Sequence, residues 1–157
     1  MLIRPIESKD DAVIHKIIQR SLESFGLDIP GTAYFDPELS HLSSYYSKRQ
    51  HAEYFIVEDK GTVLGGVGIA PFSNDGKICE LQKLYLDDAA KGLGISRLLM
   101  DKALEYASDY YEACYLETMG ILDVACLLYE KYGFELLEQP IEGSDHGTMD
   151  RWYIKDL

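Results

Sequence analysis

The chain has 157 residues, of which 46% are hydrophobic and 27% charged, and its formal net charge is −12 at pH 7. This length suits one well-packed domain, so we expect a single domain over residues 1–157. The acidic balance argues against nucleic acid as a partner, because no basic stripe is present to meet phosphates. No apolar run approaches the roughly 20 residues that span a bilayer, and the N-terminal residues lack a signal-peptide pattern. We therefore expect a cytoplasmic protein with no membrane partner.

The cysteines and histidines give no metal-binding pattern. Three cysteines are an odd number and lie in apolar stretches without metal-ligand spacing: Cys79, Cys114 and Cys126. We expect them to be reduced, buried side chains. The four histidines are scattered along the chain, so we expect no metal site.

The first third of the chain predicts one strand and two helices. Residues 2–6 predict the strand, and Ser8 is a candidate N-cap for the helix that follows. The apolar positions of that helix recur on one face: Val13, Ile14, Ile17, Ile18 and Leu22. Residues 25–46 are irregular and rich in aromatic side chains, and Asp36-Pro37-Glu38 predicts the start of a second, short helix.

The remainder alternates strands and helices. Two strands, 52–58 and 63–71, are joined by a hairpin turn, and the second contains three glycines that predict a bulge or the close approach of another chain segment. The further elements are a strand at 78–86, a helix from residue 95, a strand at 114–119, a helix at 123–132, and strands at 134–137 and 148–154. The predicted order is β-α-α-β-β-β-α-β-α-β-β.

The turn before the long helix contains two glycines, a cation and a hydroxyl. Its sequence is Lys91-Gly92-Leu93-Gly94-Ile95-Ser96. The first amides of a helix have no partner inside the helix, and the helix dipole places partial positive charge beside them. Such a turn binds either a phosphate or water.

Two motifs resemble those of the GCN5-related N-acetyltransferases. In the acetyl-CoA motif Arg/Gln-x-x-Gly-x-Gly/Ala, the defined positions are occupied by Lys91, Gly94 and Ser96. Lys91 and Ser96 depart from the usual residues, which leaves open whether they weaken CoA binding. Residues 128–134, Leu-Tyr-Glu-Lys-Tyr-Gly-Phe, resemble the family's second signature. The resemblance covers most of the chain and implies an α/β (α+β) fold with a mixed, mostly antiparallel central sheet and helices on both faces.

The resemblance also implies a set of cofactor contacts and one wall of the acceptor site. The co-substrate would be acetyl-CoA, with no metal. The pantetheine arm would pair with the backbone of Leu84, Tyr85 and Leu86. The pyrophosphate would be wrapped by the turn and the helix start, which comprise Lys91, Gly92, Leu93, Gly94, Ile95, Ser96 and Arg97. Residues 25–46 would form a wall of the acceptor site, and His146 either lines the mouth of that site or is a solvated loop residue.

Acetyl transfer to an amine needs a base, because alkyl amines have pKa values near 10. Glu80 lies where the histone-acetylating branch of the family carries its base, and it shares strand parity with Gln82, Leu84 and Leu86. Glu117 lies where the ribosomal-protein alanine acetyltransferases carry theirs. Burying a carboxylate in an otherwise apolar strand costs free energy unless the group has a partner. For either glutamate the alternative to a catalytic role is therefore a structural ion pair or hydrogen-bond network.

Tyr129 lies where family members use a tyrosine to protonate the departing thiolate. The alternative is that Tyr129 only packs in the core as an aromatic side chain. No serine, cysteine or histidine arrangement suggests an acetyl-enzyme, so we expect direct attack in a ternary complex.

The leading prediction is therefore an acetyl-CoA-dependent N-acetyltransferase that acts on a primary amine of a small molecule or an amino acid-like acceptor. The acidic composition favours a cationic acceptor, or serves solubility alone. The alternatives are a non-catalytic acyl-CoA-binding module and an enzyme acting on a protein N-terminus or lysine. A dinucleotide oxidoreductase is disfavoured, because Arg97 stands where a third glycine belongs. Trp152-Tyr153-Ile154 leaves open a homodimer through the late strands or simple core packing.

Overall fold

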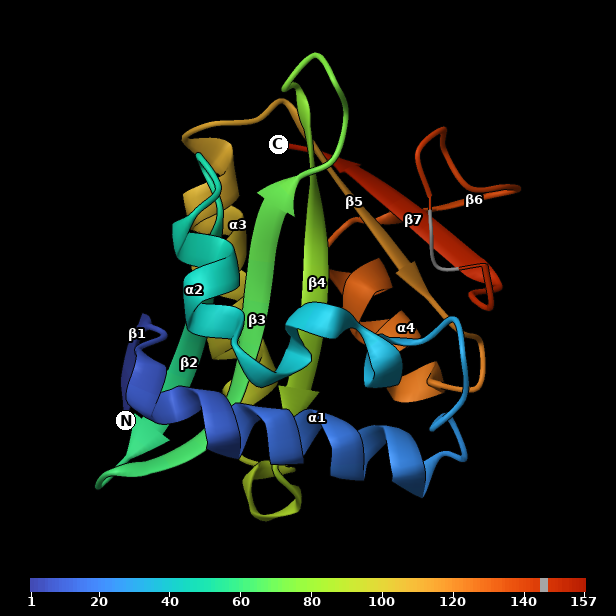
Figure 1. Cartoon of the computed structure of the whole chain (residues 1–157). Helices are drawn as coiled ribbons and strands as arrows, with labels where there is room; N and C mark the ends of the chain where they lie inside the picture. The colour runs from blue at the N-terminus through green and yellow to red at the C-terminus, as the bar shows by residue number, and fades with distance from the viewer. Residues whose placement is uncertain (145–146) are drawn as a thin grey trace.

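The computed structural model describes residues 1–144 and 147–157 and contains one seven-stranded sheet (Figure 1). The expectation for His146 lies outside the described residues. The strands are β1 (Leu2–Pro5), β2 (Glu53–Asp59), β3 (Thr62–Pro71), β4 (Ile78–Leu86), β5 (Ala113–Thr118), β6 (Glu135–Leu137) and β7 (Arg151–Asp156). Their spatial order is β1-β2-β3-β4-β5-β7-β6, and only β4 and β5 pair in parallel. The predicted element order and the mostly antiparallel sheet are confirmed.

Helices cover both faces of the sheet, as expected. On one face lie α1 (Asp11–Ser24) and α2 (Leu42–Ser47), and on the other lie α3 (Ile95–Ser108) and α4 (Asp123–Lys131) (Figure 1). Each pair of helices buries its apolar stripe against the sheet, so the core has two clusters separated by the strands. Short 3-10 turns occupy Ser8–Asp10, Ala33–Phe35, Pro37–Ser40 and Asp88–Ala90.

Two predicted boundaries are wrong for local reasons. Ser8 does not cap the first helix, because Glu7 and Asp10 form a reciprocal capping box around a 3-10 turn that begins at Ser8. The last strand begins at Arg151 rather than residue 148, since the Thr148 hydroxyl donates a hydrogen bond of 2.8 Å to the Pro30 carbonyl.

Of the two last strands, β7 lies within the sheet and β6 forms one edge of it. β7 pairs with β5 on one side and β6 on the other, and Tyr153 is fully buried. Of the two readings of Trp152-Tyr153-Ile154, core packing applies to its central residue.

A bulge at Lys83 shifts the register of β4, so that the alternation of side chains between the two faces of the sheet is reversed beyond it. Gly68 lies opposite Gln82 and Gly66 opposite Tyr85, so Lys83 and Leu84 together face one position of β3. Lys83 has a φ of 51°, in the left-handed region. Because one residue is inserted, the expected parity is wrong beyond Gln82. Leu84 and Leu86 pack against the α3–α4 cluster, whereas Gln82 faces α2.

The parallel pair β4–β5 separates partway along its length. Pairing runs from Ile78↔Ala113 to Glu80↔Tyr115 and then stops. Figure 1 shows the two strands together at one end and apart at the other, where α4 lies behind the opening. From residue 81 to 86, the β5-facing side of β4 pairs with no strand among the described residues. Backbone groups on that side are therefore available to a ligand.

Candidate functional site

Two adjoining cavities flank β4 where it separates from β5. The inner cavity, of about 100 Å³, lies between β4, β5 and α4. The outer cavity, of about 310 Å³, lies over β4 beside the segment that joins α1 to α2. Glu80, Gln82 and Lys83 line both cavities, so they form the boundary between them.

Glu80 is held by a chain of short hydrogen bonds. The buried Tyr46 hydroxyl of α2 donates to Gln82 Oε1 at 2.6 Å, and Gln82 Nε2 donates to Glu80 Oε1 at 2.6 Å. Burial raises the pKa of Tyr46 well above its ordinary value, so its hydroxyl stays a neutral donor. The chain fixes the orientation of the Glu80 carboxylate at the boundary of the two cavities.

Glu117 enters the same region from β5. It lines the inner cavity only, and the Tyr115 hydroxyl donates to its Oε2 at 2.8 Å. The structure thus brings the two predicted glutamates to one cavity from two different strands. Only Glu80 also reaches the outer cavity.

Tyr129 closes the inner cavity from α4. Its side chain is 6% exposed and its ring contacts those of Phe134 and Tyr153, with centroid separations of 6.0 and 6.1 Å. Burial raises the pKa of Tyr129 above the ordinary phenol value. Among the described residues no hydrogen bond of its hydroxyl is found, and the residue lines the inner cavity. It can therefore donate a proton to a ligand in that cavity.

The glycine turn before α3 presents unpaired amides. Gly92 and Gly94 have φ values of 82° and 75°, and a Cβ at either would meet open space. The amides of Gly92 and of residues 94–97 have no hydrogen-bond partner in the portion of the chain that is described. Lys91, beside them, pairs with Asp88 at 3.0 Å. This arrangement fits a phosphate group, which accepts several N–H donors at a helix start.

An ion-pair cluster fixes the wall of the outer cavity. Lys83 Nζ lies 2.8 Å from Asp36 Oδ2 and 3.4 Å from Glu38 Oε1, and the lysine side chain is only 5% exposed. Burial alone would lower the pKa of Lys83, but the two carboxylates outweigh it, and the net pKa is raised. The Tyr54 hydroxyl donates to the Lys83 carbonyl at 2.8 Å. Lys83 thus fastens the segment after α1 to the bulge of β4.

Three residues of the site escaped the sequence analysis: Gln82, Lys83 and Arg49. A cation within the apolar stretch of β4 was a signal for Lys83, because a charge there needs a partner. Arg49 gave no such signal, since it follows α2 beside another basic residue in a polar segment. Arg49 comes to the outer cavity because α2 packs on β2, which places the guanidinium beside the Pro71 carbonyl at the end of β3.

Other expectations concern the cysteines, metals and membranes. The three cysteines are free and buried, as expected. Residues 1–144 and 147–157 contain no group of three His, Cys, Asp or Glu side chains arranged to hold a metal ion. Among the same residues, no helix combines the length and apolar character needed to cross a membrane.

Comparisons with known proteins agree with this geometry. The model of the Acetyltransferase (GNAT) family matches residues 16–134. The uncharacterized N-acetyltransferase YjgM of Escherichia coli (strain K12) is 36% identical over 159 residues, which is 99% of this chain and 95% of that protein. N-acetylaspartate synthetase of Xenopus tropicalis is 28% identical over 123 residues, 75% of this chain and 45% of that protein. The structure of yncA from Salmonella typhimurium with its cofactor acetyl-CoA has a TM-score of 0.75 at 20% identity, covering 100% of this chain and 92% of that one.

Proposed function

Because the chain belongs to the GNAT acetyltransferase family and is an N-acetyltransferase, we propose that it transfers acetyl from acetyl-CoA to a primary amine of a small or amino acid-like acceptor. The observation that carries this proposal is the pair of cavities that meet at Glu80, one beside the unpaired edge of β4 and one open to an acceptor. An acetylated amino acid also appears in the name of the Xenopus relative.

Three parts of the chain fit acetyl-CoA. The free amides of Gly92 and of residues 94–97 suit the pyrophosphate, and the open edge of β4 over residues 84–86 suits the amide groups of the pantetheine arm. The inner cavity then receives the thioester. Lys91 and Arg97 add positive charge near the phosphates in a chain that is otherwise acidic.

In the proposed reaction the amine nitrogen attacks the thioester carbonyl, a C–N bond forms and the C–S bond breaks. Glu80 accepts the proton that the ammonium must lose, directly or through water. Tyr129 donates its proton to the thiolate as it departs, and the second proton that the nitrogen loses after attack restores the Tyr129 phenol. Glu80 is the better-placed base because it reaches both cavities, whereas Glu117 reaches only the inner one. No covalent acetyl-enzyme is involved, so both substrates bind before transfer.

The test is thiol release from acetyl-CoA across small amines, amino acids and N-terminal peptides, with the acetylated product identified by mass spectrometry. We expect amine-dependent release from the small acceptors and intersecting initial-velocity plots, which a ternary complex gives. Glu80→Gln should lower kcat by about 10²-fold or more, and Glu117→Gln by less. Thiol release with peptides alone would indicate that the acceptor is a protein and not a small amine. Tight acetyl-CoA binding without release from any acceptor would favour a binding module and contradict the proposal.

A further inference from the structure

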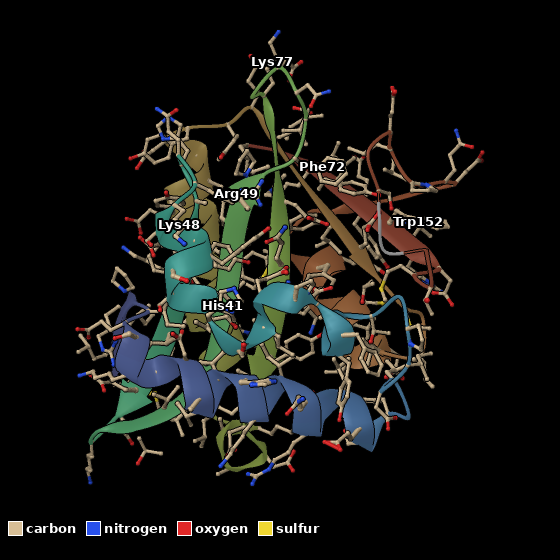
Figure 2. All side chains as sticks on the ribbon, viewed as in Figure 1. His41, Lys48, Arg49, Phe72, Lys77 and Trp152 are labelled. Atoms are coloured by element: carbon tan, nitrogen blue, oxygen red, sulfur yellow. The ribbon has the colours of Figure 1, made fainter. Side chains whose placement is uncertain are left out.

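Arg49 is a cation of the outer cavity that the proposed chemistry does not use. It follows α2, and Figure 2 shows it beside Lys48 near the end of β3. It lines the same cavity as Glu80, Gln82 and Lys83. Lys83 is neutralised by two carboxylates, whereas Arg49 forms no ion pair with a carboxylate in the described part of the chain.

The guanidinium of Arg49 is held in place by neutral groups. Its Nη1 donates to the Tyr45 hydroxyl at 2.6 Å, and its Nη2 donates to the Pro71 carbonyl at 3.4 Å. A guanidinium has five N–H donors, so two bonds leave donors for a ligand. Neutral partners fix the side chain without cancelling its charge. This is a preorganised site for a planar anion, because the guanidinium fork matches the two oxygens of a carboxylate.

The outer cavity therefore has two ends of opposite character. Glu80 lies at the boundary with the inner cavity, where an amine must stand to meet the thioester. Arg49 lines only the outer cavity, so it lies away from the inner one. Tyr45 and Phe72 add aromatic surface to the same lining. An acceptor with an ammonium at one end and an anion at the other satisfies both charges within one cavity.

We infer that the acceptor is a zwitterionic α-amino acid whose carboxylate is bound by Arg49 while its amino group faces Glu80. The inference rests on the proposed function and names its substrate class. Arg49 is then a residue that determines specificity rather than one that takes part in proton transfer. An amine without the carboxylate leaves the Arg49 donors without their ligand, and it binds less well for that reason.

The test compares each free amino acid with its primary amide and its decarboxylated amine, using leucine, methionine and phenylalanine. For wild type we expect the amino acid to have the highest kcat/KM. In Arg49→Gln the preference for the amino acid over the amide should fall by about 10- to 100-fold, which corresponds to loss of a charge-assisted hydrogen bond. The comparison is made between proteins for the same pair of acceptors, so differences in amine basicity cancel. Most of the change should lie in KM for the amino acid.

Two further variants separate recognition from folding. Lys48→Gln removes a charge from the exposed neighbour, which does not line the cavity, and should leave the preference unchanged. Arg49→Lys keeps the charge but loses the fork, and should restore the preference only in part. Because the readout is a ratio of two acceptors, a general loss of folded enzyme does not alter it.

Calorimetric titration of amino acid into enzyme saturated with CoA gives a measure that needs no turnover. We expect binding of the amino acid and weaker binding of its amide, with the difference abolished in Arg49→Gln. Equal kcat/KM for amino acid and amide, unaffected by Arg49→Gln, would overturn the inference while leaving the acetyltransferase intact. Failure of every amine to release thiol would instead contradict the proposed function.

Discussion

Replacing Lys83 by methionine tests whether its ion pairs with Asp36 and Glu38 hold the segment between α1 and α2 on the sheet. Methionine keeps nearly the same length and the same backbone requirement at a φ of 51°, so the change removes mainly the charge. Breaking a buried ion pair costs about 3–5 kcal/mol. Lys83 is 5% exposed, but Asp36 and Glu38 are 14% and 18% exposed. Some water therefore reaches the carboxylates, and we expect the lower end, about 3 kcal/mol.

For a chain of this size, 1 kcal/mol shifts Tm by about 2–4 °C, so Lys83→Met should lower Tm by about 6–12 °C. Thermal unfolding followed by circular dichroism measures it, with Lys77→Met as the control at an exposed lysine of the β3–β4 turn (Figure 2). Adding Asp36→Asn to Lys83→Met should recover part of the loss, because one carboxylate no longer needs a cation. A Tm within about 2 °C of wild type for Lys83→Met would refute the reasoning.

Three further outcomes are expected. Gly94→Ala should raise the KM for acetyl-CoA, because a left-handed non-glycine residue costs about 1–2 kcal/mol and the proposed function assigns the phosphates to this turn. Gly26→Ala, with a similar φ and open space, should leave that KM unchanged. Tyr46→Phe should lower kcat by about 10-fold at unchanged acetyl-CoA KM, since Gln82 loses the donor that orients it towards Glu80, the proposed base. Asp10→Asn should have a lower Tm than wild type at neutral pH. The Tm difference between the two proteins should become smaller when Tm is measured at pH values below about 4.

The sign of the acid effect follows from the environment of Asp10. Burial alone would raise the pKa of this carboxyl, but hydrogen bonds from Arg4 and from the Glu7 amide outweigh it, and the pKa lies below its usual value. A lowered folded-state pKa stabilises the protein at pH values above the unfolded pKa, near 3.9. That contribution is lost as the pH falls through the folded-state value. A Tm difference that stays constant between pH 7 and pH 2 would contradict this account.

Most elements of the fold can be predicted from patterns of residues that lie close together in the sequence. Two glycines before an amphipathic run predict the start of α3 at Ile95, and an apolar stretch between turns predicts β4 over Ile78–Leu86. Both predictions are confirmed because they depend on residues close together in the sequence. Glu80, Glu117 and Tyr129, the three catalytic candidates of the sequence, lie around one cavity.

The rest of the site depends on contacts between distant segments. The bulge at Lys83 arises from how β4 pairs with β3, so the sequence of β4 alone predicts the wrong face for Leu84. The ion pair between Lys83 and Asp36 joins β4 to the segment between α1 and α2. Arg49 reaches the outer cavity because α2 packs on β2, which brings the Arg49 guanidinium to the Pro71 carbonyl at the end of β3. Residue spacing carries no information on such juxtapositions.

The most direct test of the account is amine-dependent thiol release by wild type and Tyr129→Phe at saturating acetyl-CoA. The phenylalanine ring keeps the packing against Phe134 and Tyr153 and removes only the hydroxyl that faces the inner cavity. The account predicts release by wild type and a kcat about 10²-fold lower in the variant, with the acetyl-CoA KM little changed. Equal kcat in the two proteins would contradict the assignment of Tyr129 as the proton donor. Release that does not depend on any amine would contradict acetyl transfer at this site.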